Sequence, residues 1–395
     1  LEACGNIGAV SEGKQINDTI VSMGLLEKSN MLGTALVDMY ARCGMFAKAK
    51  EVLETLSIKD ITAWNAIISG YVQHEEGYNS LFCFEQMRKE GVSSNEVTLV
   101  YILKACGSIR AIERGKEIHN EILRRRLLEE NFVIGTALID MYAKCGMLAK
   151  ALEVLEELHV KDTISWNALI AGYAQHRQGL EALECFERMQ REGLSPDEVT
   201  FACILRACGS IGALDKGKQI HEEIDNQGFL ENNVMLGTAL VDMYVKCGMF
   251  VKAQQVLKNL PVRNVISWNT IITGYAQAGN FSEVLGCFKE MEKEGLLPDE
   301  VTFVGVLNAC SHSGEMDEAQ LYYENMSEKY GITPNLEHHA CMVMVFGYGG
   351  CFDKALSVIE MMLSCDHPSV WLALLGACKK WGNVKLGRLA CHQTI

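Results

Sequence analysis

Residues 30–40 read NMLGTALVDMY, and closely similar letters return as FVIGTALIDMY at 132–142 and as VMLGTALVDMY at 234–244. Consecutive copies start 102 residues apart. The same interval separates three tryptophans of the chain, Trp64, Trp166 and Trp268. Self-similarity at a fixed long period is the signature of a repeat architecture, in which each repeat is one supersecondary structure.

Each 102-residue block divides into three related repeats of 31, 35 and 36 residues, here called short, medium and long. The nine repeats are expected at 30–60, 61–95, 96–131, 132–162, 163–197, 198–233, 234–264, 265–299 and 300–335. They form three triplets, 30–131, 132–233 and 234–335. We interpret 1–29 as part of a long repeat, 336–367 as a degenerate short repeat and 368–395 as the beginning of a further extension.

Each repeat has the apolar pattern of two helices. In repeat 30–60, Leu36, Met39 and Tyr40 are spaced by three and four residues, which places them on one helical stripe. Val52 and Leu56 belong to a second stripe. One hairpin cannot bury both stripes alone, whereas stacked hairpins can. The sequence therefore predicts an all-α fold: a right-handed α-solenoid superhelix of stacked antiparallel helix-turn-helix repeats with a concave surface.

The composition excludes several classes of protein. The formal net charge is −14, and the longest basic run is Arg124-Arg125-Arg126, so a strongly basic nucleic-acid binder is excluded. The 16 cysteines are dispersed without a Cys-x-x-Cys motif, which indicates free thiols in a reducing compartment. No apolar run is long enough to span a membrane, and no targeting segment is visible.

Two motifs resemble catalytic signatures without completing them. Gly8-x-x-x-x-Gly13-Lys14 lacks the Ser or Thr that a phosphate-binding loop needs after its lysine. His-x-Glu, as at His119, is half of a zinc deaminase signature, and the Pro-Cys-x-x-Cys half is absent. We expect these histidines to cap or solvate helix ends. No catalytic residue, metal site, cofactor or small-molecule substrate is predicted, and the chain is not expected to be an enzyme.

The rotating repeat lengths, with GTALVDMYARCG, ISWNALIAGYAQ and EVTFACILRACGSIGALDKGKQIH, resemble the mixed-length (PLS) subfamily of plant pentatricopeptide-repeat (PPR) proteins. PSVWLALLGACKKWGNVKLG at 368–387 resembles the E-type extension of members that act in organellar RNA editing. The resemblance implies binding of single-stranded RNA at about one base per repeat. It also implies a mitochondrial or plastid specificity factor for C-to-U editing, splicing or processing, with a deaminase or other effector supplied in trans.

In that family the fifth and the last residue of each repeat face the base. The short repeats carry Thr34 with Asp60, Thr136 with Asp162, and Thr238 with Asn264. The medium repeats carry Asn65 with Asn95, Asn167 with Asp197, and Asn269 with Asp299. The long repeats carry Val100 with Asn131, Ala202 with Asn233, and Val304 with Asn335. The family's pairings then imply the target 5′-GYNGUNAUN-3′, with weak reading by the long repeats.

The second residue of each repeat is expected to wedge between neighbouring bases. These residues are apolar except for Thr62, and they are Met31, Val97, Val133, Ile164, Val199, Met235, Ile266 and Val301.

Two alternatives stay open at this point. Asp and Asn at repeat boundaries are also ordinary helix N-caps, although capping does not require the observed alternation between them. Stacked hairpins also serve as protein-binding scaffolds of the tetratricopeptide type, which the acidic charge favours. Repeat lengths of 31, 35 and 36 disfavour that class, because its units keep to about 34 residues.

Overall fold

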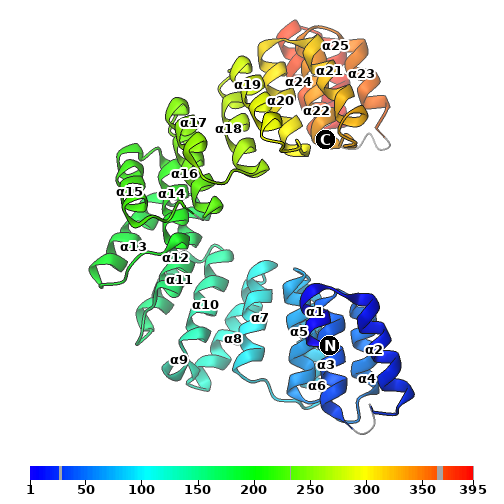
Figure 1. The fold of residues 1–395 in the computed structure, drawn as a ribbon, viewed down its shortest axis with the longest axis vertical. Helices are drawn as coiled ribbons and strands as arrows, with labels where there is room; N and C mark the ends of the chain where they lie inside the picture. Colours follow the sequence, from blue (N-terminus) through cyan, green and yellow to red (C-terminus); the bar gives the residue numbers. More distant parts are fainter. Residues whose placement is uncertain (26–28, 232, 363–367, 395) are drawn as a thin grey trace. The chain divides into compact units, whose positions relative to one another are not determined.

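The computed structural model describes residues 1–25, 29–231, 233–362 and 368–394, and all regular structure over these residues is helical (Figure 1). The first helices of the hairpins are α1 (Glu2–Ile7), α3 (Asn30–Arg42), α5 (Ile61–Gln73), α7 (Glu96–Ser108), α10 (Phe132–Lys144), α12 (Thr163–Gln175), α14 (Glu198–Ile211), α16 (Val234–Lys246), α18 (Val265–Gln277), α20 (Glu300–Ser313), α22 (Leu336–Tyr348) and α24 (Pro368–Trp381). The second helices are α2 (Val10–Ser22), α4 (Phe46–Thr55), α6 (Gly77–Lys89), α8 (Ile112–Arg124), α11 (Leu148–Glu157), α13 (Gly179–Arg191), α15 (Leu214–Gln227), α17 (Phe250–Asn259), α19 (Phe281–Lys293), α21 (Met316–Glu328), α23 (Phe352–Glu360) and α25 (Val384–Gln393). A one-turn helix, α9 (Leu127–Glu130), precedes α10.

The chain divides into two compact parts, 1–207 and 208–395, and the two-layer arrangement holds within each. In the first part α1, α3, α5, α7, α10 and α12 pack side by side in chain order, and in the second part α16, α18, α20, α22 and α24 do the same. A second helix contacts the first helix of its own hairpin and, at most boundaries, the first helix of the next. The expected all-α class of stacked helical hairpins is confirmed.

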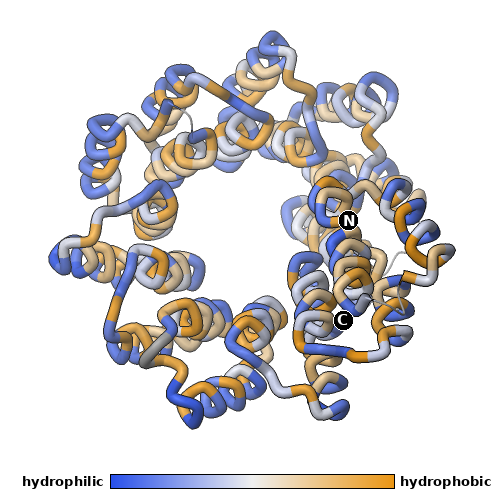
Figure 2. Tube along the Cα trace, turned by 60° about the horizontal axis from the view of Figure 1, so that its bottom comes forward, coloured by the Kyte–Doolittle hydropathy of each residue, from blue (hydrophilic) through white to orange (hydrophobic). Residues whose placement is uncertain are grey.

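The hydrophobic core lies between the two layers. Leu36, Met39 and Tyr40 of the predicted stripe are buried, as are Trp166 and Trp268. Figure 2 shows the hydrophobic residues concentrated where the helices face one another, while the second helices carry hydrophilic residues on their outer side. Burial of these faces between successive hairpins is what stabilises a fold whose single repeat has no closed core.

Glycine allows consecutive first helices to approach closely. A Cβ added at Gly70 would lie 2.5 Å from the Cβ of Ala41, and one added at Gly172 would lie 2.6 Å from the Cβ of Ala143. Both positions are on the first helix of a medium repeat, facing the first helix of the preceding short repeat. The row of first helices is therefore tightly spaced at the short–medium boundary.

The expectation that the histidines of the His-x-Glu motif cap or solvate helix ends was wrong for His119 and for His221, which has the same motif. His119 is buried, and its Nδ1 lies 2.8 Å from the Tyr142 hydroxyl of the next repeat. His221 makes the same contact with Tyr244 at 2.9 Å. Both belong to second helices of long repeats and contact the first helix of the following short repeat.

The remaining flanks are also helical. Residues 368–394 form the hairpin α24–α25, and α24 packs on α22 of the expected degenerate repeat. The end of that repeat, 363–367, lies outside the described residues. Within the described residues, no helix is long and apolar enough to cross a membrane. The described cysteines are free thiols.

Candidate nucleic-acid interface

The last residue of each repeat is the N-cap of the next first helix. Its Oδ1 accepts a backbone N–H two or three residues later at each of the nine boundaries, at Asp60, Asn95, Asn131, Asp162, Asp197, Asn233, Asn264, Asp299 and Asn335. Capping is thus realised throughout. The capping bond uses the Oδ1 atom, which Asp and Asn both possess. The two residues differ at the other side-chain atom, which is a second carboxylate oxygen in Asp and an amide NH2 in Asn.

In the medium repeats the fifth and the last residue are joined by a hydrogen bond. The Asn65 amide donates to Asn95 Oδ1 at 3.2 Å. The corresponding bond from Asn167 to Asp197 Oδ1 is 2.9 Å long, and that from Asn269 to Asp299 Oδ1 is 2.8 Å long. The structure therefore brings together the three pairs that the sequence assigned to these repeats.

The asparagines at the fifth position of the medium repeats are largely buried. Asn65, Asn167 and Asn269 are 9%, 7% and 6% exposed, whereas the last residues are half-buried or exposed. One amide hydrogen and one oxygen lone pair of each asparagine remain beyond the bonds within the site. The bond to the last residue of the repeat orients each of these amides.

The Asp197 carboxylate is held in its ionised form. Burial acts to raise its pKa, but hydrogen bonds from the Thr200 backbone N–H, the Asn167 amide and the Thr200 hydroxyl outweigh burial. The pKa of Asp197 is therefore lowered from its ordinary value, and at neutral pH the residue only accepts hydrogen bonds.

The short repeats have a different local structure. The hydroxyls of Thr136 and Thr238 donate to the carbonyls of Phe132 and Val234 at 3.1 and 2.8 Å, within their own helix. Thr34 Oγ1 is buried without a hydrogen-bond partner among the described residues. In the described parts of the chain no hydrogen bond joins these threonines to Asp60, Asp162 or Asn264, so here the structure does not link the fifth residue directly to the last.

The long repeats present apolar fifth residues. Val100 and Val304 are half-buried, and Ala202 is buried. Their last residues bond to polar neighbours instead: the Asn335 amide donates to Glu300 at 2.9 Å, and the Asn131 amide bonds to Glu96. Asn233 accepts the Leu236 N–H as a cap. The long repeats therefore lack a polar fifth side chain to contact a base edge.

The expected wedge residues are exposed at one recurring position of the repeats. Their exposed fractions run from 47% to 78% in Met31, Val97, Val133, Ile164, Val199, Met235, Ile266 and Val301. Large apolar side chains at one recurring exposed position are unlike the scattered exposure of an ordinary surface. In the second part of the chain Ile266 and Val301 line a groove of about 340 Å³ together with Asn269, Asp299 and Lys246. The Asn269–Asp299 pair, two of the expected wedge residues and a lysine therefore share one groove in this part of the chain.

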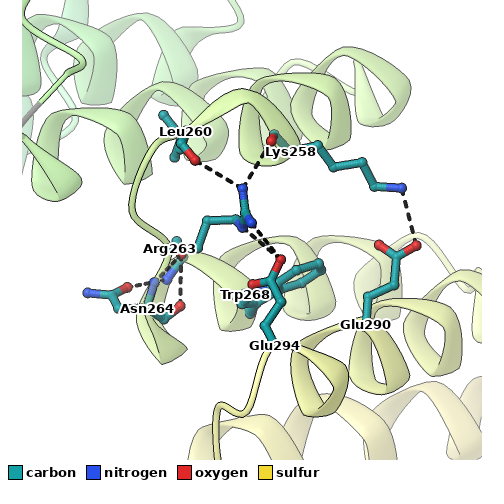
Figure 3. Close-up of polar contacts among 8 residues, drawn as sticks. Lys258, Leu260, Arg263, Asn264, Trp268, Glu290 and Glu294 are labelled. Carbon is teal, nitrogen blue, oxygen red and sulfur yellow. Dashed lines mark hydrogen bonds and ion pairs between the residues drawn. The ribbon is translucent and has the colours of Figure 1, made fainter.

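A polar cluster holds the loop that ends at Asn264 (Figure 3). The Arg263 guanidinium donates to the carbonyls of Lys258 and Leu260, both at 3.0 Å, and pairs with the Glu294 carboxylate at 2.8 Å. The same carboxylate accepts the indole N–H of Trp268 at 2.9 Å. These contacts tie the end of the short repeat to the residue that follows α19 of the medium repeat.

Reasoning from the sequence missed Thr98, Thr200 and Thr302, the third residues of the long repeats. All three are fully buried, and each contacts the fifth and the last residue of the medium repeat before it, here called the reading pair. The available signal was a hydroxyl residue three positions after an Asn or Asp, the pattern of a reciprocal N-cap. That pattern predicts a bond to the backbone and not one to a residue of the preceding repeat.

The fold is that of a helical-repeat protein in which each medium repeat holds a bonded polar pair and the second position of most repeats is an exposed apolar side chain. The PPR repeat family matches residues 161–210 and 263–312, and the PPR repeat matches 34–60, 62–92, 136–162, 238–265, 301–330 and 340–367. The chain belongs to the pentatricopeptide-repeat family.

Curated relatives agree with this assignment. A mitochondrial pentatricopeptide repeat-containing protein of Arabidopsis thaliana is 34% identical over 98% of this chain and 69% of its own length. A chloroplastic one is 34% identical over 100% of this chain and 46% of its own length. A third is 37% identical over 96% of this chain, which spans 52% of it. The chain therefore spans about half to two thirds of the relatives it matches.

A solved structure shares the fold. PPR10 in complex with an 18-nt psaJ RNA element matches with a TM-score of 0.72 at 18% identity, over 91% of this chain and 54% of PPR10.

Proposed function

We propose that this chain binds single-stranded RNA sequence-specifically, with about one base per repeat. The observation that carries the proposal is the hydrogen-bonded Asn–Asp or Asn–Asn pair in each medium repeat. At the third medium repeat this pair shares a groove with the exposed apolar side chains Ile266 and Val301. The apolar residues supply stacking surfaces that tolerate any base, and the amide pair supplies donors and acceptors for the base edge. The PPR10 structure is a complex with an RNA element, which is in keeping with this use of the fold.

The proposed target is 5′-GYNGUNAUN-3′, with the first repeat at the 5′ end. The medium repeats are proposed to bind the pyrimidines, because an Asn amide and a neighbouring acceptor match the N–H and carbonyl groups of uracil. Long repeats contribute unspecified bases because their fifth residues are Val100, Ala202 and Val304.

The cellular role proposed is that of an organellar specificity factor for C-to-U editing or for processing or splicing. One of the relatives is named as mitochondrial and another as chloroplastic, which supports an organellar site of action. Within the described residues no cluster of three or more His, Cys, Asp or Glu side chains is arranged to hold a metal ion. We propose that a deaminase or another effector supplied in trans carries out any deamination or cleavage.

Fluorescence anisotropy with labelled RNA tests the proposal. The chain should bind an RNA containing GUAGUAAUA more tightly than a scrambled RNA of equal length and composition. Equal affinity for both would contradict the proposal and favour a protein-binding scaffold.

A further inference from the structure

The third residue of each long repeat makes a set of contacts that recurs three times. Thr98, Thr200 and Thr302 are fully buried. Their hydroxyls lie 2.7, 2.6 and 2.6 Å from the Oδ1 of the fifth asparagine in the preceding medium repeat. They also lie 2.9, 2.8 and 2.9 Å from the Oδ1 of that repeat's last residue. Each hydroxyl therefore contacts both members of the reading pair.

The hydroxyl has one proton and two acceptors before it, so it bridges the pair. In the second triplet the Asn167 amide nitrogen donates to Asp197, and the Asn167 oxygen accepts from Thr200. Thr200 Oγ1 in turn accepts the Asp197 backbone N–H at 3.1 Å. Rotation that exchanged the Asn167 oxygen and nitrogen would lose the bond to Asp197 and place the Asn167 oxygen against the Asp197 carboxylate, so the amide is held in one orientation.

We propose that Thr98, Thr200 and Thr302 are positioning residues that set base specificity in the preceding medium repeat, an inference that rests on the proposed RNA binding. A locked amide presents one N–H and one lone pair in a fixed order, and that order distinguishes uracil from bases with the opposite arrangement. The long repeat, whose own fifth residue is apolar, thus contributes its first turn to the reading of its neighbour's base. The reading element is the medium repeat plus the first three residues of the long repeat.

Other boundaries lack this bridge. At the start of the second medium repeat the Ser165 hydroxyl bonds only to the Asp162 backbone, at 2.8 Å from its carbonyl and 3.1 Å from its N–H. The first medium repeat has Ala63 at this position, and the second and third short repeats have Ile134 and Leu236. Within the described residues, a hydroxyl bridging the fifth and last residues is found only where a long repeat follows a medium one. Ser165 is therefore a matched control for the capping contribution of such a hydroxyl.

The test compares Thr200→Val, Thr200→Ser and Ser165→Ala with the parent chain. Affinity is measured for RNAs that carry U, C, A or G at the fifth base of the proposed target. Valine keeps the volume and removes the hydroxyl, so the preference for U over A should fall by about fivefold to tenfold, the usual worth of one hydrogen bond. Serine should restore the preference, and Ser165→Ala should leave it unchanged.

Several outcomes would overturn the inference. They are an unchanged preference in Thr200→Val, a loss in Thr200→Ser as large as in the valine variant, or an equal loss in Ser165→Ala. Thr302→Val, read out at the eighth base, repeats the test in the other part of the chain if Thr200→Val fails to fold. Failure of the proposed function is distinguishable, because the parent chain would then not discriminate the target from a scrambled RNA.

Discussion

At the boundary between the second medium repeat and the long repeat after it, the Asp197 carboxylate accepts both the Thr200 N–H and the Asn167 amide. Asp197→Ala removes the cap as well as the partner of Asn167, and we expect it to destabilise the chain by about 1 kcal/mol. Asp197→Asn keeps the capping oxygen and should destabilise the chain by only about a few tenths of 1 kcal/mol. Urea unfolding followed by circular dichroism measures both, and equal losses would show that the carboxylate charge, not the cap, stabilises this boundary.

Base preference should follow the identity of the pair. Asn167→Thr combined with Asp197→Asn reproduces the pair Thr238 and Asn264 of the third short repeat. The preference at the fifth base should move from U toward A by about tenfold, the discrimination expected of one good edge contact. Preference at the second base, read by the untouched Asn65 and Asn95, is the internal control. A loss of preference at both bases would point to a general defect and not to a change of specificity.

The residue types of the site could be predicted from the sequence, but the way they are held could not. Alternation of Asp and Asn in otherwise similar repeats identified Asp197 and Asn95 as candidates. The low exposure of Asn167 and its bond to Thr200 depend on how closely α12 and α14 approach each other. A periodic pattern specifies which faces are buried, whereas a hydrogen bond across two repeats depends on distances of a few tenths of an ångström.

At the scale of the element, the spacing of consecutive first helices depends on glycine. A Cβ at Gly172 on α12 would lie 2.6 Å from the Cβ of Ala143 on α10, so the two helices would have to separate. We expect Gly172→Ala to destabilise the chain by about 1–3 kcal/mol through overpacking. Gly286→Ala on α19 is the control, because an added Cβ meets nothing within 4 Å there. Helix propensity alone should make that variant more stable by up to about 1 kcal/mol, as judged by its urea midpoint.

The contact between α8 and α10 should make stability depend on pH. Burial, aided by Lys150 and opposed by Glu157, lowers the pKa of His119 below its ordinary value of 6.5. Below pH 6.5 the unfolded chain therefore binds a proton at this site that the folded chain resists, and stability falls as the pH falls. For one histidine the loss between pH 6.5 and 5.5 is at most about 1.4 kcal/mol. His119→Asn should show a smaller shift of the urea midpoint between these pH values, and an equal shift in both proteins would contradict the assignment.

The fold class of the whole chain could be predicted because the 102-residue period fixes the repeat and the apolar stripes fix its two helices. Tertiary packing then only repeats one local arrangement. The burial of His119 was not predicted, because the sequence alone is compatible with either a solvent-exposed or a packed histidine on a second helix. Its contact with Tyr142 becomes visible only when the neighbouring repeat is in place.

The net charge of −14 is compatible with RNA binding because of where the charges lie. The first helices of the medium repeats, α5, α12 and α18, carry no charged residue. Second helices hold much of the acidity: α21 carries Asp317, Glu318, Glu324 and Glu328 and no lysine or arginine. The helices that carry Asn65, Asn167 and Asn269 thus add no charge of their own to the repulsion that the net charge implies.

Few cations are available to RNA phosphates along the first helices. On the first helices of the short repeats, Arg42, Lys144 and Lys246 are already paired with aspartates one turn earlier, at 2.8, 2.8 and 2.7 Å. Lys104 and Arg206 are exposed on the first helices of long repeats. With about three to five phosphates neutralised, the slope of log K against log salt concentration should be about −2 to −3.5 for a single strand.

Affinity measured from low to physiological salt, for the target and for a scrambled RNA, tests this distribution of charge. The ratio of the two affinities should stay nearly constant, because base-edge contacts and stacking depend little on counterion release. Replacing Lys104 by Gln should make the slope less negative by about 0.7 for both RNAs without altering their ratio, since a phosphate contact carries no sequence information. A slope steeper than about −6 would show that phosphate contacts, and not the paired side chains of the first helices, supply most of the binding.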